Sequence, residues 1–328
     1  MTGVQTCALP IFDEDGNVFL AGWTSSSNYP TSDGAFDKSF NGGSFDAVVS
    51  CLNADLTTLV ASTFLGGYEW DFGYSMTFGE NGDVYVAGHT ASSHTSYIRF
   101  PTTAGAYRET YQGGGSNTDD AFIARFNHDL TTLLACTYYG GSGFENGTSI
   151  KIGEDEKVYL GGATTSPNLE TFKNTFDPDY AGGSLYSGDA FVAVFNNNLS
   201  EHTAFSYIGG SGSECLGSML IDNSGYIYIS GSTNSDNFPT TDNTYQSDYA
   251  GGSTGLWLNE DDWGGDIFIS KLNFDQFTRI TEGDFVNSGM ATQGVSWGDY
   301  DGDGYDDLLV TNINYPSGAN NQIGRAHV

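Results

Sequence analysis

Residues 120–162 read DAFIARFNHDLTTLLACTYYGGSGFENGTSIKIGEDEKVYLGG, and this stretch decides the fold. It contains short segments rich in β-branched and aromatic residues, at 121–126, 133–139, 149–152 and 158–160. Gly, Asn and Asp separate these segments, as is typical of turns between strands. Because no helical periodicity is present, the stretch predicts four short antiparallel strands.

The same pattern recurs along the chain with fixed spacings. Segments that begin with Asp stand at Asp46, Asp120, Asp189 and Asp266. After each of the first three, a pair of glycines follows, and its second Gly lies 21 residues after the Asp. Another Gly, which closes a further strand-like segment, lies 21 residues after that second Gly. Only one connection per repeat varies in length, so the period is about 66 to 77 residues. Insertions of this kind gather on one face of a repeat fold.

Several of the predicted strands are apolar on successive residues, for example at 84–86 and 191–194. A strand of this kind is covered on both faces. A four-stranded antiparallel unit covered on both faces needs neighbours of its own kind, as blades have in a β-propeller. We therefore expect an all-β fold, a β-propeller of four-stranded antiparallel blades, with about four repeats present and the ring incomplete.

These repeats resemble the bacterial β-propeller repeat family called SBBP. The resemblance rests on Gly82–Gly88, Phe100–Tyr107, Asp120–Asn127 and Thr137–Gly143, and it extends over residues 12–275. It implies blades that belong to a seven-bladed ring. The fourth repeat departs from the pattern, since no strand with paired glycines follows its Asp-led segment.

The segment 276–322 has a different composition. Asp299, Asp301 and Asp303 lie two residues apart in a turn that contains Gly, and Asp307 follows. Ca²⁺ binds six to eight oxygens, which closely spaced carboxylates around a tight turn supply. An EF-hand would need Glu where Val310 stands. We therefore expect a short calcium loop that leads directly into a strand at 308–311.

This second segment resembles the FG-GAP/VCBS repeat of integrin-like propellers, including the preceding Trp297–Tyr300. The resemblance implies a Ca²⁺ site whose ligands are Asp299, Asp301, Asp303, the Tyr305 backbone carbonyl and Asp307. The alternative is an acidic surface turn that holds no ion.

Both ends of the sequence are similar to sequencing-adapter read-through. One DNA string that encodes residues 323–328 has a reverse complement whose translation matches residues 6–11. We therefore expect residues 1–11 and 323–328 to derive from an adapter. The expected domains are the propeller repeats at 12–275 and a truncated calcium repeat at 276–322, in a fragment that has lost its signal peptide.

Composition excludes two classes of partner. The chain has 10 Lys and Arg against 41 Asp and Glu, a formal net charge of −31. So few cations cannot neutralise a nucleic-acid backbone or bind an anionic membrane surface. No apolar run approaches the ~18 residues of a membrane span. We therefore expect no nucleic-acid partner and no membrane insertion.

The remaining chemistry-bearing residues give few signals. Cys51, Cys136 and Cys215 occupy different repeat positions, so we expect unpaired, buried cysteines. The histidines form no metal-binding spacing and are expected at the surface or in loops. Outside the adapter-like ends they are His89, His94, His128 and His202. No pair of carboxylates is singled out as catalytic.

The longest variable loop is the candidate ligand-binding site. Two Trp there flank acidic and amide groups, an arrangement that can stack on a sugar ring and hydrogen-bond its hydroxyls, or serve a protein interface. The residues are Trp257, Asn259, Glu260, Asp261, Asp262 and Trp263. The alternative is an insertion packed on its own blade.

Together these observations favour a non-catalytic module of a secreted or cell-surface bacterial protein. It would act in adhesion, scaffolding or binding of an extracellular glycan or protein ligand, with Ca²⁺ stabilising the C-terminal repeat. The alternative is a polysaccharide-active lyase or hydrolase whose site lies on the variable-loop rim. The sequence predicts neither the ligand nor the oligomeric state.

Overall fold

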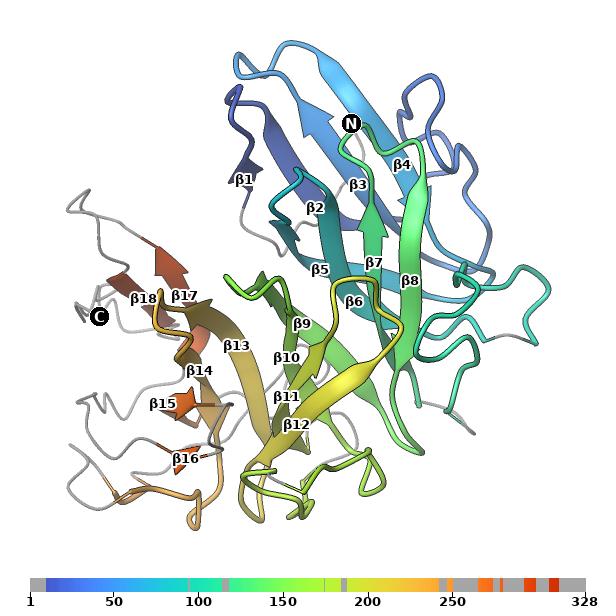
Figure 1. Cartoon of the computed structure of the whole chain (residues 1–328). Helices are drawn as coiled ribbons and strands as arrows, with labels where there is room; N and C mark the ends of the chain where they lie inside the picture. The colour runs from blue at the N-terminus through green and yellow to red at the C-terminus, as the bar shows by residue number, and fades with distance from the viewer. Residues whose placement is uncertain are drawn as a thin grey trace, which may run out of the picture. The chain divides into compact units, whose positions relative to one another are not determined.

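The computed structural model describes residues 10–93, 95–113, 118–173, 175–183, 188–241, 247–249, 265–273, 278–279, 292–298 and 307–312. All regular elements in these ranges are β-strands (Figure 1). The chain forms two compact units. One comprises residues 1–160 and 193–203, and the other comprises 161–192 and 204–328.

The first two sheets are four-stranded, and strands adjacent in sequence pair antiparallel. The first sheet contains β1 (Ile11–Phe12), β2 (Val18–Thr24), β3 (Asp46–Leu52) and β4 (Leu59–Leu65). The second contains β5 (Asp71–Phe78), β6 (Val84–Thr90), β7 (Asp120–Phe126) and β8 (Leu133–Tyr139).

The later strands repeat this order. The third sheet contains β9 (Glu145–Ile152), β10 (Val158–Thr164), β11 (Asp189–Phe195) and β12 (His202–Ile208). The fourth contains β13 (Glu214–Ile221), β14 (Ile227–Thr233), β15 (Asp266–Asn273) and β16 (Thr278–Arg279). Last, β17 (Thr292–Gly298) pairs antiparallel with β18 (Asp307–Asn312).

The four strands predicted from residues 120–162 are confirmed, but they belong to two sheets. The segments at 121–126 and 133–139 are β7 and β8 of the second sheet, whereas 149–152 and 158–160 lie in β9 and β10 of the third. A repeat spacing gives the length of each repeat, but it does not show at which strand one sheet ends and the next begins. Each paired-glycine segment carries the chain from one sheet to the next, so the variable connection lies inside a sheet, between its second and third strands.

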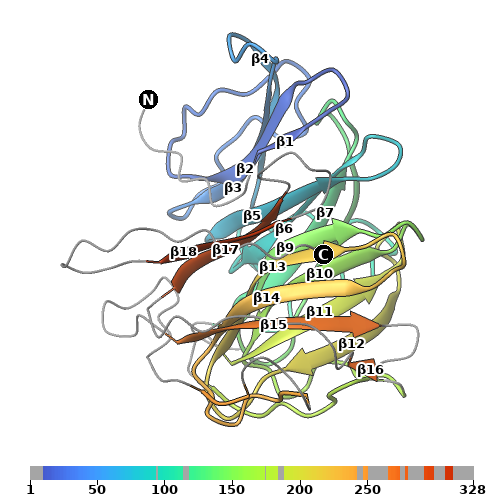
Figure 2. The same cartoon turned by 90° about the vertical axis from the view of Figure 1, so that its left-hand side faces the viewer.

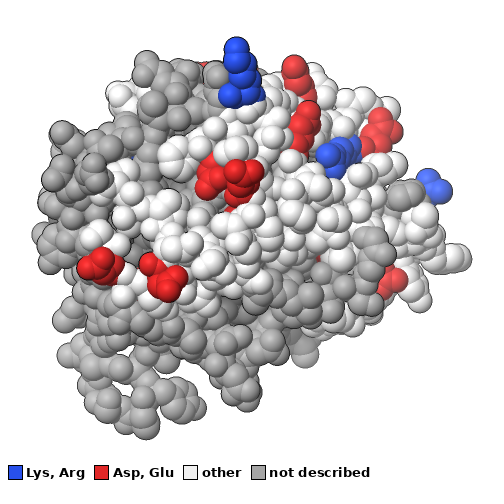
Figure 3. Space-filling model, turned by 90° about the horizontal axis from the view of Figure 1, so that it is seen from below, with Lys and Arg blue, Asp and Glu red and all other residues white. Residues whose placement is uncertain are grey.

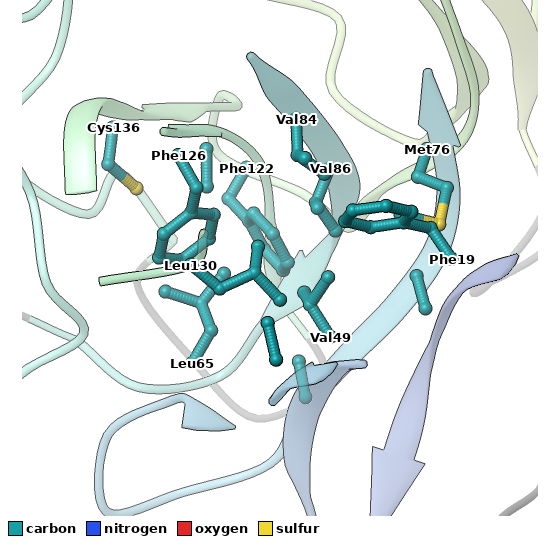
Figure 4. Close-up of a cluster of buried hydrophobic side chains, with 14 of the residues drawn as sticks. Phe19, Val49, Leu65, Met76, Val84, Val86, Phe122, Phe126, Leu130 and Cys136 are labelled. Atoms are coloured by element: carbon teal, nitrogen blue, oxygen red, sulfur yellow. The ribbon is translucent and has the colours of Figure 1, made fainter. Parts of the chain in front are cut away.

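The strands that are apolar on successive residues are covered on both faces, as predicted. Every residue of β6 and of β11 is buried. Within the first unit β5 packs against β2 and β3 of the first sheet, and the two sheets lie side by side (Figures 1 and 2). Val49 and Leu65 of the first sheet face Val86 and Phe122 of the second in one hydrophobic cluster (Figure 4). Full burial of each such side chain stabilises the fold by about 1.5–3 kcal/mol.

Tight turns join the first and second strands of each of the four four-stranded sheets. In each turn a backbone N–H donates to the carbonyl three residues earlier, as from Gly82 to Gly79 at 2.9 Å. The donor residue has a positive φ, which is 75° at Gly82 but 59° at Glu156, where the other repeats have Gly. The prediction that the recurring Asn, Asp and Gly residues serve turns is therefore confirmed.

Two histidines differ from the prediction that they lie at the surface or in loops. His89 on β6 and His202 on β12 are buried, with 7% and 6% of their surface exposed. Aromatic rings of neighbouring residues pack around the imidazole of His89 and exclude solvent from it. His128 is partly exposed, and His94 lies outside the described residues. Cys51, Cys136 and Cys215 are free and buried, as predicted.

Candidate functional site

The two sites predicted from sequence lie mainly outside the described residues. These are the calcium ligands Asp299, Asp301, Asp303 and Tyr305 and the loop residues Trp257, Asn259, Glu260, Asp261, Asp262 and Trp263. Asp307 is the first residue of β18, and its backbone pairs with Gly298 at the end of β17. The two ends of the acidic loop are therefore held together, and the strand expected after the loop is confirmed.

The described residues bring a different set of acids together, once in each of three repeats. An Asp at the start of the third strand of one sheet meets an acid at the start of the first strand of the next sheet, 25 residues later. We call these the acidic pairs, and they are Asp46–Asp71, Asp120–Glu145 and Asp189–Glu214. All six residues have 0% of their surface exposed.

A glycine separates the two carboxylates of each pair. A Cβ atom built on Gly209 would lie 2.7 Å from both Asp189 Oδ1 and Glu214 Oε2. At Gly140 the corresponding distances are 2.5 Å to an oxygen of Asp120 and 2.6 Å to one of Glu145. Any side chain here would collide with both carboxylates, so the first of the paired glycines is required for this close approach.

The second acid of each pair is a hydrogen-bond acceptor for the following turn. Glu214 accepts from the Gly210 N–H at 3.0 Å and from the hydroxyls of Thr233 and Ser235, both at 2.5 Å. These three donors favour the ionised form of the carboxylate, but burial has the larger effect and raises the pKa of Glu214. The equivalent bonds in the other repeats run from Gly67, Thr90 and Ser92 to Asp71, and from Gly141 to Glu145.

The first acid of each pair is less well satisfied. Its Oδ2 accepts one backbone N–H, from Asn41 to Asp46, from Gln112 to Asp120 and from Ala181 to Asp189. Asp120 Oδ1 also accepts the Gly113 N–H at 3.2 Å. Among the described residues, Asp46 Oδ1 is buried and has no hydrogen-bond partner, whereas the Gly182 N–H also acts on the Asp189 carboxylate and lowers its pKa.

Burial next to a second acid makes ionisation of the first acid costly. Burial raises the pKa of Asp46 and of Asp189 to about 7, and that of Asp120 to about 8. The charge of Glu214 acts in the same direction on the pKa of Asp189. Burial also raises the pKa of Asp71 well above its ordinary value. Such a pair can share a proton or hold a cation. Because it is enclosed, it cannot reach a polymeric substrate.

The sequence pattern marks the first acids as strand starts and the glycines as strand ends, but it does not pair either with the second acids. The signal that would have found the acidic pairs is their constant 25-residue separation across three repeats with variable loops. Among the described residues, no group of three or more His, Cys, Asp and Glu side chains is placed so that it could hold a metal ion.

Two family models match parts of this chain. The SBBP model, described as a beta-propeller repeat, matches residues 205–239. The FG-GAP model, described as an FG-GAP repeat, matches residues 291–328. The chain carries an SBBP β-propeller repeat followed by an FG-GAP repeat. Both resemblances found in the sequence are thus confirmed, as is the fold class, a β-propeller of antiparallel four-stranded sheets.

The solved structures that match this chain have low sequence identity to it. A protein of unknown function from Dyadobacter fermentans is 10% identical with a TM-score of 0.47, over 92% of this chain and 73% of that one. An ulvan lyase, a polysaccharide lyase, is 10% identical with a TM-score of 0.44, over 93% and 63%. The β-propeller domain of the trilobed protease from Pyrococcus furiosus is 8% identical with a TM-score of 0.35, over 95% and 70%. No curated protein matches the chain.

Proposed function

We propose that this SBBP and FG-GAP repeat chain is a non-catalytic binding module of a secreted or cell-surface bacterial protein. It binds an extracellular glycan or protein ligand through its variable loops, and Ca²⁺ stabilises its C-terminal repeat. FG-GAP and propeller repeats are typical of extracellular proteins. The part of the chain that the structure describes contains no helix suited to crossing a membrane.

The observation that carries the calcium part of the proposal is the position of the acidic loop. The FG-GAP match spans the Asp-rich residues 299–307, and the pairing of Gly298 with Asp307 closes the loop at its base. Closely spaced carboxylates on a closed loop supply the oxygen ligands that Ca²⁺ requires. Extracellular modules bind Ca²⁺ with Kd values of about 10⁻⁴–10⁻³ M, which suits the calcium concentration outside cells.

The charge distribution supports a ligand other than a polyanion. On the face shown in Figure 3, Asp and Glu side chains stand in small separate groups between uncharged residues, and Lys and Arg are few. The net charge of the chain, −31, favours solubility and repels nucleic acids. A neutral glycan or a protein is the partner that these charges admit.

The calcium proposal is tested by thermal unfolding with and without EDTA. Chelation should lower the Tm of the wild-type chain, and the Asp303→Ala variant should show a smaller decrease because it has lost a loop ligand. The matched control is Asp129→Ala, which removes one exposed acidic charge elsewhere. Equal EDTA effects in the wild type and Asp303→Ala would exclude the loop as the calcium site.

The binding proposal is tested on an array of plant and marine glycans. The same samples are scored for retention of the chain and for release of shortened products. Retention without product, reduced in Trp257→Ala and Trp263→Ala, supports a binding module. Product release by the purified chain would instead establish the polysaccharide-active alternative, and absence of retention on both glycans and candidate proteins would contradict the loop as the site.

A further inference from the structure

Three of the four exposed aromatic side chains among the described residues lie at one place in the first unit. Tyr68, Trp70 and Tyr97 have 45%, 51% and 89% of their surface exposed. Tyr68 and Trp70 stand between β4 and β5, two residues apart, so their Cα atoms are within about 7 Å. Tyr97 stands between β6 and β7, and its ring meets that of Tyr68 edge to face, with the centroids 6.1 Å apart. A single exposed apolar residue is ordinary, but a group of them marks an interaction site.

The connection between β4 and β5 departs from its counterparts in the following repeats. Residues 66–71 read GGYEWD, whereas the corresponding turns of the next two repeats read GGSGFE and GGSGSE. The counterparts of Trp70 are Phe144 and Ser213, and both are buried, with 4% of their surface exposed. Ser and Gly are therefore sufficient for this turn. The two large rings that the first turn places at the surface are not required by the fold.

The connection between β6 and β7 carries an insertion at the same place. A Pro follows Gly88 after 13 residues, whereas it follows Gly22 and Gly231 after 8. Tyr97 lies in this longer stretch. Two departures from the repeat, far apart in the sequence, thus meet where the rings of Tyr68 and Tyr97 are in contact.

Backbone contacts hold the two connections against each other. The Tyr68 N–H donates to the Ile98 carbonyl at 2.9 Å, and the Ala91 N–H donates to the Trp70 carbonyl at 2.8 Å. A Cβ atom built on Gly67 would lie 2.8 Å from the Ile98 carbonyl oxygen, so the two chains are closely packed. The backbones that carry the rings are fixed before any ligand arrives, which reduces the entropy lost on binding.

The groups beside the rings are polar. Ser93, Thr95 and Ser96 precede Tyr97, and the hydroxyls of Ser93 and Thr95 lie 2.9 Å apart. Exposed aliphatic side chains stand elsewhere, in the turn between β3 and β4 and on β4 and β8. The charged residues next to the rings, Glu69 and Arg99, are exposed and have opposite signs. The surroundings therefore offer hydroxyls and no net charge.

This combination fits a sugar better than a protein. One face of a pyranose ring presents C–H groups with a partial positive charge, which pack on the negative face of an aromatic ring, while its hydroxyls bond to hydroxyls. A stable protein interface buries about 800 Å² on each partner and has few charges at its centre. Glu69 stands between Tyr68 and Trp70, and three partly exposed rings do not supply that area.

We propose that Tyr68, Trp70 and Tyr97 form an aromatic platform on which a neutral polysaccharide chain stacks. The platform rests on the proposed function and deepens it, because it names a neutral glycan as the ligand and places a site in the first unit. Its residues differ from those of the loop at 257–263. The net charge of −31 opposes a polyanionic chain at the same place.

The test is isothermal titration calorimetry of the full chain with neutral hexasaccharides, namely cellohexaose, xylohexaose, mannohexaose, laminarihexaose and agarohexaose, and with anionic hexagalacturonate. At least one neutral probe should bind. Tyr97→Ala and Trp70→Ala should each weaken this binding about 3- to 10-fold, the scale of one aromatic contact. Tyr97→Phe keeps the ring and should bind as the wild type does. Thermal unfolding verifies that each variant is folded.

The matched control is Phe12→Ala, which removes the fourth exposed aromatic side chain and should leave binding unchanged. Unchanged binding in Tyr97→Ala, or an equal loss in Phe12→Ala, would overturn the platform. Loss of binding only in Trp257→Ala and Trp263→Ala would also overturn it but would support the proposed function. If no neutral probe bound, the platform would be wrong, and a protein ligand would remain for the proposed function.

Discussion

Asp189 Oδ1 and Glu214 Oε2 both lie 2.7 Å from the point that a Cβ atom on residue 209 would occupy. Gly209→Ala should therefore force one carboxylate out of its set of hydrogen bonds. Overpacking of a buried site costs about 1–3 kcal/mol, and we expect a loss near 2 kcal/mol in the free energy of unfolding. Urea denaturation monitored by tryptophan fluorescence measures this loss.

The control for this prediction is Gly105→Ala. Gly105 has a φ of 82° with no atom within 4 Å of the added Cβ, so its substitution adds backbone strain alone. That strain costs about 1–2 kcal/mol without a collision. If Gly209→Ala, which adds no strain of this kind, left the free energy of unfolding unchanged, the close approach of the two carboxylates would be wrong.

Two equivalent leucines should respond oppositely to the same substitution. Leu56 and Leu130 both have a φ of 55°, in turns between the third and fourth strands of their sheets. Leu56 is 61% exposed, so Leu56→Gly should relieve backbone strain and stabilise the chain by about 0.5–1 kcal/mol. Leu130 is fully buried in the cluster of Figure 4, so Leu130→Gly should destabilise it by about 2 kcal/mol. Thermal unfolding of both variants measures the direction of each change in stability. A change in the same direction for both variants would contradict the prediction.

The strands could be predicted because their information is local. In β7 and β8, β-branched and aromatic residues lie between Asn and Gly turns, and their positions follow from the sequence alone. The assignment of β9 to the next sheet could not be predicted in this way. It depends on which strand edges meet after Gly140 and Gly141, and pairing between strands is a property of the folded chain.

The acidic pairs escaped prediction for a related reason. Asp189 at a strand start and Glu214 after a Gly-rich turn each have an ordinary local explanation. Only the fold shows that these residues, 25 positions apart, share one buried site. The burial of His89 was missed similarly, because the aromatic rings around it come from β5 and from the segment before β9.

Arg125 should not be replaceable by Lys. Its guanidinium donates to Asp83 Oδ2 at 2.6 and 2.8 Å and to Asn197 Oδ1 at 2.5 Å, and it lies 5.5 Å from the Tyr85 ring centroid. An ammonium cannot reach both partners from one position. We expect Arg125→Lys to lower the free energy of unfolding by about 1–2 kcal/mol, measured in urea.

The control for Arg125 is the exposed ion pair between Lys157 and Asp155, with 42% and 41% of their side chains accessible. Lys157→Met should change stability by less than about 1 kcal/mol, because solvent screens such pairs. Equal losses in the two variants would show that the enclosed network of Arg125 adds nothing beyond a surface ion pair.

His89 should make the chain sensitive to acid. Its ring lies 4.8 Å from that of Phe72 and 5.3 Å from that of Tyr74, and burial lowers its pKa to about 3. Asp119 Oδ2, the acid that faces it, is 3.5 Å from Nε2, and burial raises the pKa of Asp119 to about 6. Asp119 is therefore partly protonated between pH 5 and pH 7.5. Its own effect on stability is present both in the wild type and in a variant that changes His89 alone, so it cancels when the two are compared.

The sign follows from the depressed pKa. Below the unfolded pKa of about 6.5 the unfolded chain binds a proton that the folded imidazole does not, so stability falls as the pH decreases toward 3. Each pH unit in this window costs about 1.4 kcal/mol. Relative to His89→Phe, the wild type should lose about 2 kcal/mol in the free energy of unfolding between pH 7.5 and pH 5, measured by urea denaturation at both values.

The control is Phe72→Leu, which removes a neighbour of His89 that has no titrating group and should lose the same stability at both pH values. Parallel stabilities of the wild type and His89→Phe across this range would mean that the imidazole reaches solvent in the folded chain.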